Sequence, residues 1–345
     1  MVKLITRLLL LLIIAAGIAL FLLLTPATAF NGKTKYIYVR EGEDAKTQIL
    51  RQMDTASIIS REGIFTMAAN AIGIWKNITP GRFEIKKDES LFDIIRTFQK
   101  NRHQVASLNI GRVRTREGLA RYIGKNLATD SATAIRLLND STYLQKFGVD
   151  TNTLLSIIIP GNYTFTWNIS LDSVLSRFKA TAADFWATGG RVQKAADMGF
   201  SPLQISILAS IVEEETTKDE DKGNIASVYI NRLHKNMALG ADPTIKFALK
   251  DFALTRILFG HLTVSSPYNT YTHKGLPPGP ICTPTRTTID AVLNAPATNY
   301  LYFVAKTDFS DTHHFSATFE EHEKYAQAYR KALDSLAEKK QLEAK

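Results

Sequence analysis

An uninterrupted apolar run from Leu8 to Leu24 is the feature that most limits how this chain can fold. Lys3 and Arg7 precede the run, and Thr25 and Pro26 close it. At the helical rise of about 1.5 Å per residue, a run of this length spans roughly 26 Å, close to the thickness of a bilayer core. Because no polar side chain interrupts it, the run predicts a membrane-embedded helix and not a soluble core helix.

Two interpretations of this segment stay open. The positive charges lie before the run, so the rest of the chain is expected on the extracytoplasmic side. Ala27-Thr28-Ala29 has the small-x-small pattern of a signal-peptide cleavage site. The run is long for a signal peptide, however, and no other apolar stretch would hold the chain at a membrane. We therefore favour an uncleaved single-pass anchor in residues 1–30, with a removed signal peptide as the alternative.

The charge of the chain is unevenly distributed. Its 42 Lys and Arg against 33 Asp and Glu give +9, and residues 1–130 hold 20 of the bases and 11 of the acids. Residues 131–345 hold 22 of each and are neutral. The segment 100–125 carries seven bases and one acid, which we interpret as a solvated face or as a patch facing an acidic polymer or lipid headgroups. No basic stripe with interleaved aromatics is present, so no nucleic-acid partner is expected.

The region after the anchor has a recognisable order of elements. Lys35 to Arg40 and Gly81 to Lys86 read as strands, and Ala45 to Met53 and Ile64 to Ala71 read as helices between them. This β-α-α-β order resembles a LysM module, a small glycan-binding unit. We expect residues 31–111 to form this module and its extension, which adds a helix at 91–99 and a strand at 104–110.

A well-formed helix start occurs at Ser201-Pro202-Leu203-Gln204. Ser201 can cap the helix, Pro202 suits its first position, and Gln204 can complete a capping box. The helix is expected to run to Thr216 and to end in three consecutive acids. Helical spacing predicts that one group of residues falls on its polar side, namely Ser206, Ser210, Glu213 and Glu214.

Glu215 differs from its two acidic neighbours. It follows Ile207 and Ile211 at +8 and +4, so it continues the apolar stripe of the helix. A carboxyl group placed there is partly desolvated, which raises its pKa. A carboxylic acid that stays protonated near neutral pH can protonate the leaving oxygen of a glycosidic bond. The alternative is that the helix frays here and that Glu215 is simply solvated.

Several other stretches are consistent with a carbohydrate site. Asp242 is a natural cap for a helix that begins at Pro243. The loop 266–280 is rich in proline and carries aromatic and amide side chains, which suit sugar rings and N-acetyl groups. Further expected elements are an apolar strand at 157–163, a helix at 224–233, a strand at 300–305 continued by 314–316, and an amphipathic helix from 320.

Other chemistries lack their usual patterns. The seven His residues show no H-E-x-x-H motif, and His313, His314 and His322 have poor spacing for a metal site. No G-x-S-x-G or P-loop pattern occurs. Cys282 is a single cysteine with no base near it in the sequence, and we expect it to be buried packing. No metal and no cofactor are expected.

Five motifs in one order resemble those of the endolytic murein transglycosylases, the MltG or YceG-like family. They lie within residues 201–325: Ala209-Ser210-Ile211-Val212-Glu213-Glu214-Glu215-Thr216, Asn231-Arg232-Leu233, Asp242-Pro243-Thr244, Tyr268-Asn269-Thr270-Tyr271 with Gly275-Leu276-Pro277-Pro278-Gly279, and Tyr300-Leu301-Tyr302-Phe303-Val304. The chain departs from the family pattern at Gly111-Arg112-Val113 and at Pro160-Gly161-Asn162-Tyr163.

The resemblance implies an α+β fold: an N-terminal transmembrane helix, the LysM-like module, and a mixed α+β YceG-like catalytic domain over residues 112–345. It implies cleavage of the β-1,4 bond between N-acetylmuramic acid and N-acetylglucosamine without water, leaving 1,6-anhydro ends. Glu215 would be the catalytic acid and base, with Glu213 as the fallback. Asn269 and Tyr271 would hold the glycan, and Asp242 would support the site.

The expected setting is the extracytoplasmic side of the inner membrane, where cleavage would end growing peptidoglycan strands, beside cell-wall synthases as possible partners. Two alternatives stay open. A non-catalytic peptidoglycan-binding scaffold would keep the module and the anchor but lack a desolvated acid, and a hydrolytic muramidase would release reducing ends.

Overall fold

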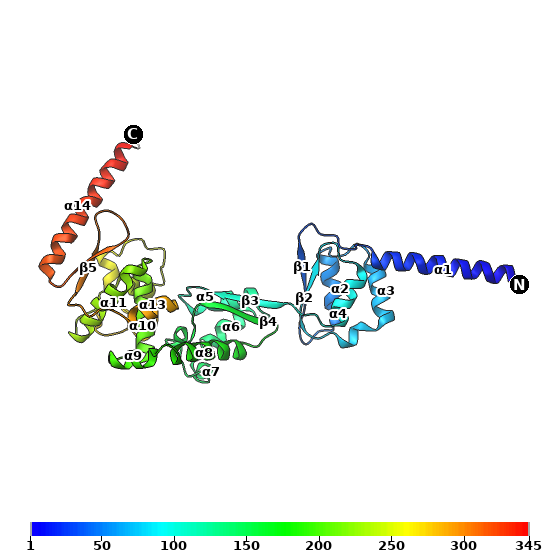
Figure 1. Cartoon of the computed structure of the whole chain (residues 1–345), viewed down its shortest axis with the longest axis horizontal. Coiled ribbons are helices and arrows are strands. Elements are labelled where there is room, and N and C mark those ends of the chain that lie inside the picture. The colour runs from blue at the N-terminus through cyan, green and yellow to red at the C-terminus, as the bar shows by residue number, and fades with distance from the viewer. Residues whose placement is uncertain (1, 344–345) are drawn as a thin grey trace. The chain divides into compact units, whose positions relative to one another are not determined.

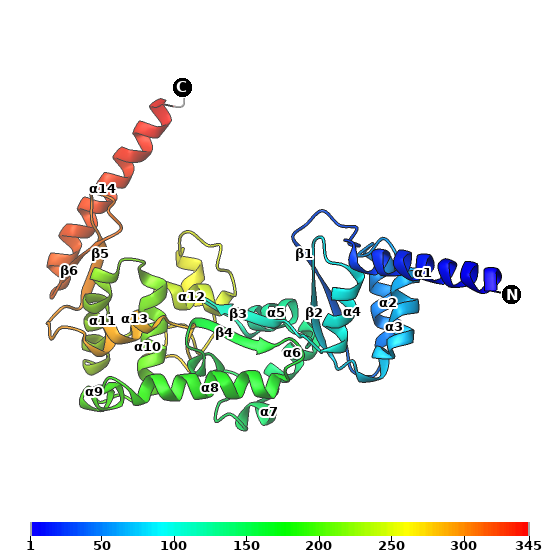
Figure 2. The same ribbon diagram turned by 45° about the vertical axis from the view of Figure 1, so that its right-hand side comes forward.

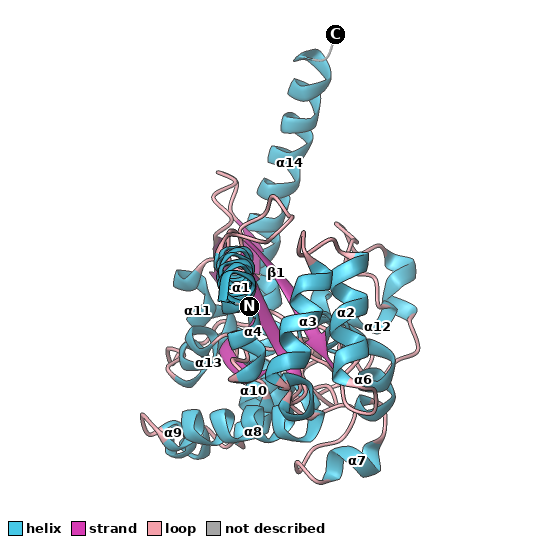
Figure 3. Ribbon diagram, turned by 90° about the vertical axis from the view of Figure 1, so that its right-hand side faces the viewer, coloured by secondary structure: helices cyan, strands magenta, loops and turns pink. Residues whose placement is uncertain are grey.

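The computed structural model describes residues 2–343 and shows a mixed α+β chain in which helices predominate (Figures 1 and 3). The described strands form three two-stranded sheets, β1–β2, β3–β4 and β5–β6. Contacts divide the chain into two compact units. Unit 1 consists of residues 1–108, 124–130 and 164–170, and unit 2 consists of residues 109–123, 131–163 and 171–345.

The apolar run forms a long helix, as predicted. Helix α1 covers Val2–Leu24, and its segment Lys3–Leu24 has a mean hydropathy of 2.8 with none of it buried. Within the described residues it is the single helix that is long and apolar enough to cross a membrane alone. Leucines all round it are exposed, including Leu8 and Leu20 at 56% and 57%. A helix that is apolar on every side is suited to lipid, and a signal sequence has the same character.

Unit 1 contains the predicted β-α-α-β order. Strand β1 (Thr34–Val39) pairs antiparallel with β2 (Gly81–Lys86), and Ile37 lies opposite Phe83, both fully buried. Between them lie α2 (Ala45–Thr55), α3 (Glu62–Ile72) and the short 3₁₀ helix η1 (Ile74–Asn77); α4 (Leu91–Gln99) follows β2. The inward faces of these elements form one hydrophobic core. The order is confirmed, whereas the LysM-like identity stays a prediction.

The residues after α1 are folded into unit 1. Ala27 is 1% exposed; its N–H donates to the Glu89 carbonyl at 2.9 Å, and its carbonyl accepts from the Ser60 N–H at 2.8 Å. The Ala29 N–H donates to the Ile58 carbonyl at 2.9 Å. Arg61 adds side-chain hydrogen bonds to the backbone of residues 25 and 26. The segment 25–29 is therefore an integral part of the unit.

The remaining elements are mostly helices, and four short strands lie among them. In chain order they are β3 (Val105–Ile110), α5 (Arg116–Asn126), α6 (Ser131–Leu138), α7 (Ser141–Gln145), η2 (Leu154–Ile157), β4 (Gly161–Thr166), α8 (Leu171–Ala187), α9 (Arg191–Asp197), α10 (Pro202–Glu215), α11 (Asp219–His234), α12 (Asp242–Leu249), η3 (Phe259–Thr263), α13 (Arg286–Leu293), β5 (Tyr302–Ala305), β6 (His313–Ser316) and α14 (Phe319–Glu343). The strand predicted at 157–163 is confirmed only for residues 161–163. Ile157 ends the 3₁₀ helix η2, Ile158 caps it, and the strand begins at Gly161, after Pro160.

Helix α10 lies at the centre of the unit 2 core and packs against α11, α12 and α13 (Figure 2). Its predicted capping box is present, with Ser201 accepting from the Gln204 N–H and Gln204 accepting from the Ser201 N–H. The prediction that Ser206 and Ser210 face the polar side was wrong, since both are buried. Neighbouring elements enclose the helix on several sides, and each serine satisfies its hydroxyl by donating to a carbonyl of the preceding turn.

The predicted strands near the carboxyl end are confirmed. β5 and β6 pair antiparallel, with Phe303 opposite Phe315, and α14 packs against both strands. Cys282 is fully buried, as expected. Burial raises the pKa of its thiol, which keeps it protonated and unreactive.

Candidate functional site

The three acids that end α10 have different partners, beginning with Glu213. Its carboxylate accepts from the Thr285 N–H at 3.2 Å and from the Thr285 hydroxyl at 2.9 Å, and it also accepts from the Thr288 hydroxyl. Thr285 is the N-cap of α13. Glu213 therefore places its negative charge at a helix N-terminus, where backbone N–H groups and the helix dipole stabilise it. This is a structural role, in which a single oxygen, Oε2, accepts all three hydrogen bonds.

Glu214 forms ion pairs with two arginines. The Arg114 guanidinium makes a bidentate contact with both carboxylate oxygens at 2.8 and 2.9 Å, and Arg112 lies 3.5 Å away. The Glu214 side chain is only 12% exposed. A bidentate contact of this kind fixes the geometry of the carboxylate. It also links the end of α10 to the segment at which the sequence departs from the family pattern.

Glu215 faces the cavity that also holds two other predicted site residues, Asp242 and Tyr271. The carboxyl is half-buried, accepts a hydrogen bond from the Tyr229 hydroxyl of α11, and lines an open cavity of about 300 Å³. Desolvation raises its pKa to about 7, the Tyr229 hydrogen bond opposes that shift, and the charge of Asp242 adds to it. A substantial fraction of Glu215 is therefore protonated at neutral pH. The cavity is lined by Glu215, Tyr229, Arg232, Gly240, Asp242, Tyr271, Phe303 and His322.

Asp242 and Tyr271 meet in the same cavity. The Tyr271 hydroxyl donates to Asp242 Oδ1, and this carboxylate contact together with desolvation raises the pKa of Tyr271. The prediction that Asp242 caps a helix was wrong. The helix begins one residue earlier, Ala241 is its N-cap, and Asp242 lies in the first turn. Its exposed carboxylate is thereby available to the cavity, because it is not tied to backbone N–H groups.

Asn269 lies inside its loop. It is fully buried, and its amide group donates to the carbonyls of Leu262 and Val264 at 2.8 and 2.9 Å. Its Oδ1 accepts from the Tyr271 N–H at 3.0 Å. The structure thus brings Glu215, Asp242 and Tyr271 together but keeps Asn269 out of the cavity lining. This geometry gives Asn269 a positioning role, in which it fixes the backbone that carries Tyr271.

Asn269→Ala is expected to lower the free energy of unfolding by about 2–4 kcal/mol, because two backbone carbonyls and one N–H lose their buried partner. Chemical denaturation of the full chain would measure the loss. Asn269→Asp is the comparison variant: it retains the acceptor for Tyr271 but turns a buried carboxylate toward the Leu262 and Val264 carbonyls, so it should be at least as destabilised as Asn269→Ala. A direct glycan contact predicts the opposite pattern, with unchanged stability and a raised KM.

Tyr229, Arg232 and His322 are cavity residues that the sequence did not predict as site residues, although Arg232 belongs to one of the five motifs. Tyr229 and Arg232 lie three residues apart on α11, a spacing that puts them on one helix face and that offers a usable signal. Arg232 is fixed by hydrogen bonds from Nε to the Leu301 carbonyl at 2.7 Å and from its terminal nitrogen to the Leu239 carbonyl at 2.6 Å. It supplies a positive charge with little freedom to move.

His322 reaches the cavity from α14. Its ring stacks on Tyr302 with centroids 5.3 Å apart, and burial lowers its pKa, so the ring is neutral at pH 7. Nδ1 is buried and has no hydrogen-bond partner among the described residues. More than a hundred residues separate His322 from Glu215, so only the tertiary fold brings the two together.

Comparisons with known proteins agree with one another. The model of the YceG-like family matches residues 37–328. A protein of Bacillus subtilis named endolytic murein transglycosylase is 42% identical over 125 residues, which are 35% of this chain and 33% of that protein. A protein of the same name from Streptococcus pneumoniae D39 is 25% identical over 315 residues, covering 82% of this chain and 56% of that protein.

A solved structure supports the fold. The crystal structure of a yceG-like protein from Listeria monocytogenes covers 85% of this chain and 98% of its own, with a TM-score of 0.57 and 24% sequence identity. At that identity the likeness concerns the fold alone. The chain aligns with between a third and a little over half of the length of the curated relatives.

Proposed function

The chain belongs to the YceG-like family, and on that premise we propose that it is an endolytic murein transglycosylase. Two relatives carry that name. The proposed reaction breaks the β-1,4 bond between N-acetylmuramic acid and N-acetylglucosamine within a glycan strand and leaves a 1,6-anhydro end. In this role it would end the growth of nascent strands.

The observation that carries the proposal is the state of Glu215. It is the one acid of the three that lines the cavity shared with Asp242 and Tyr271, and its pKa of about 7 leaves it partly protonated. The protonated carboxyl gives its proton to the glycosidic oxygen as the bond to C1 breaks. The resulting carboxylate takes the proton of the muramyl C6 hydroxyl, whose oxygen bonds to C1. Glu215 ends protonated again, and no water is consumed.

The surrounding groups suit both steps. The Tyr229 hydroxyl stabilises the carboxylate that forms after the first transfer, and the fixed Arg232 adds a positive charge that acts in the same direction. Asp242 opposes ionisation and keeps the proton available beforehand. We assign glycan binding to Tyr271 and Asp242, whose polar atoms reach the cavity, and a positioning role to Asn269.

A single carboxyl is enough for this reaction, because the substrate supplies its own nucleophile. Glycosidases that use water generally need two carboxyl groups about 5–9.5 Å apart. Asp242 shares the cavity, and a hydrolytic muramidase in which it acts as the second carboxylate is therefore the competing function. Its hydrogen bond from Tyr271 favours a binding role over that of a base. A non-catalytic scaffold would not need a desolvated acid in an open cavity.

We propose that α1 is an uncleaved membrane anchor and that residues 112–345 form the catalytic domain on the extracytoplasmic side of the inner membrane. Cleavage after Ala29 would remove the buried Ala27 together with its hydrogen bonds to Glu89 and Ser60, and would break the core of unit 1. The intact mass of the protein purified from membranes should therefore include residues 1–29. A soluble chain beginning at Phe30 would contradict the anchor.

The module in residues 31–111 has the β-α-α-β order of a LysM-like unit, and we propose that it binds the glycan near the membrane. We propose cell-wall synthases as protein partners, because they would act at the same side of the same membrane.

The proposed activity is tested by incubating the full-length chain in detergent with purified murein. Chromatography of the products should show shortening from long strands to strands of intermediate length from the first time points, as internal cleavage requires. Release of disaccharides alone from the strand ends would contradict the endolytic reaction, and unchanged strand length would contradict the enzyme itself.

A further inference from the structure

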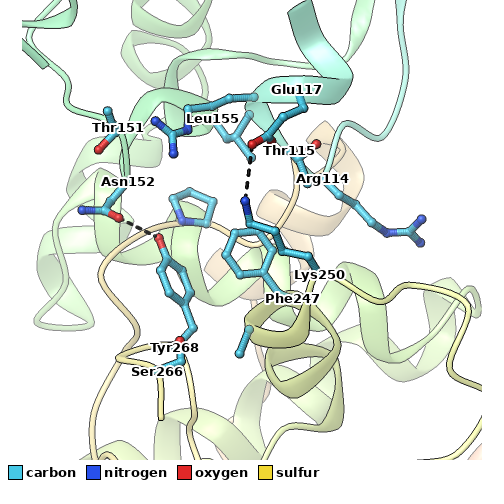
Figure 4. Close-up of a pocket in the computed structure, with 13 residues that line it drawn as sticks. Arg114, Thr115, Glu117, Thr151, Asn152, Leu155, Phe247, Lys250, Ser266 and Tyr268 are labelled. Carbon is cyan, nitrogen blue, oxygen red and sulfur yellow. Dashed lines mark hydrogen bonds and ion pairs between the residues drawn. The ribbon is translucent and has the colours of Figure 1, made fainter. Parts of the chain in front are cut away.

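A second cavity lies in unit 2 beyond the far end of α12 (Figure 4). Its volume is about 210 Å³, and its walls come from the start of α5, the η2 segment, the end of α12 and the loop 266–280. In Figure 4, Phe247 and Tyr268 lie on one side of the space, and Asn152 and Glu117 lie on the other. None of the predicted site residues lines it.

Helix α12 connects this cavity to the one that holds Glu215. Asp242, at its first turn, lines the Glu215 cavity, and Phe247 and Ala248, near its end, line the second one. A third, small cavity of about 50 Å³ is lined by Pro243 and Lys246 between them and shares Phe247 with the second cavity. At about 1.5 Å per residue, the six steps from Asp242 to Ala248 advance roughly 9 Å along the helix. Residues at the start, in the middle and near the end of α12 thus line the three cavities in turn, so one helix borders all of them.

The lining suits a neutral sugar better than an isolated anion. Two of its cations are paired with acids, with Lys250 3.4 Å from Glu117 and Arg114 held by Glu214. The third, Arg116, donates to the Leu138 carbonyl at 3.4 Å. Tyr268 donates its hydroxyl to Asn152 Oδ1 at 3.3 Å, and no hydrogen bond among the described residues uses the NH₂ group of Asn152. Hydroxyl and amide groups beside the apolar faces of Leu155 and Phe247 match the mixed surface of an N-acetylated sugar.

We propose that this cavity is a remote subsite that binds a second part of the same glycan strand, a few sugar units from the bond that Glu215 cleaves. The inference rests on the proposed function and deepens it. A glycan strand that binds at two points along α12 has a fixed position in the catalytic cavity. The enzyme therefore cleaves long glycan strands in preference to short fragments.

Ala248→Trp tests the subsite by filling it. Ala248 is half-buried against the cavity, whereas Leu249, the next residue of α12, is 36% exposed and does not line it. Leu249→Trp is therefore the matched control for size and helix position. With long strands, Ala248→Trp should raise KM about tenfold, the equivalent of one or two lost hydrogen bonds, and leave kcat nearly unchanged. With short fragments that occupy only the Glu215 cavity, it should match wild type, and Leu249→Trp should match wild type on both substrates.

Equal losses on long and short substrates, or no loss on long strands, would overturn the subsite. A wild-type chain that cleaves neither substrate would instead contradict the proposed function. A binding measurement distinguishes a failure of the subsite from a failure of the proposed function. Co-sedimentation of long strands with the full-length Glu215→Gln chain should weaken about tenfold when Ala248→Trp is added and should not change with Leu249→Trp. Undiminished binding would overturn the subsite whether or not the wild type is active.

Discussion

Glu215→Gln is expected to reduce cleavage of murein by about a thousandfold or more, because the same group acts as acid and base in successive steps. Glutamine keeps the size of the side chain and can still accept the Tyr229 hydrogen bond, so the fold is retained. The variant should also be more stable than wild type above pH 7. Burial raises the pKa of Glu215 to about 7, so keeping it ionised above that pH costs free energy that an amide does not. Initial rates on purified murein and unfolding curves at pH 5 and pH 8 would measure both effects.

Glu213→Gln is the matched control, two residues away on the same helix. Glu213 serves the N-terminus of α13 through Thr285 and Thr288, so its replacement should lower stability and leave activity within about tenfold of wild type. Loss of activity in Glu213→Gln together with retention in Glu215→Gln would mean that the fallback residue is the catalytic one.

The second large effect is expected in the pH dependence of kcat/KM. The first step needs protonated Glu215, and the protonated fraction falls as the pH rises through the pKa of about 7. Activity should therefore fall about tenfold per pH unit on the alkaline side of that value. Tyr229→Phe removes a hydrogen bond that lowers the pKa of Glu215, so this alkaline limb should move to higher pH. A pH series of initial rates on murein measures the position of the limb.

Asp242→Asn supplies the opposite shift as a control. The Asp242 charge raises the pKa of Glu215, so its removal should move the alkaline limb to lower pH, while the asparagine oxygen still accepts from Tyr271. Shifts of opposite sign in the two variants would identify Glu215 as the titrating group. A limb that stays in place in both variants would show that another group controls the rate.

The features that the sequence predicted well depend on neighbours along the chain. The capping box of α10 involves residues three apart, and the pairing of β1 with β2 follows from alternating apolar residues. The environment of Glu215 was predictable in the same way, because its position on the apolar stripe already implied desolvation and a raised pKa. The three acids looked alike by composition, and helical periodicity separated one of them.

The features that the sequence could not predict depend on tertiary partners. Nothing near Asp242 in the chain shows that Tyr271 will contact it, or that Ala241 will be the cap. The burial of Ser206 and Ser210 arises from helices that enclose α10 on several sides. His322 enters the cavity on a helix that a charge pattern indicated only as amphipathic. In each case the deciding contact joins segments that are far apart in the chain.

The most direct test of the central claim is the fate of water during cleavage. Murein is digested by the full-length chain in water enriched in heavy oxygen, and the new ends are analysed by mass spectrometry. Transfer to the C6 hydroxyl predicts 1,6-anhydro-muramyl ends that carry no heavy oxygen and that are absent with Glu215→Gln. Reducing muramyl ends that carry the heavy isotope would contradict this account and identify a hydrolytic muramidase.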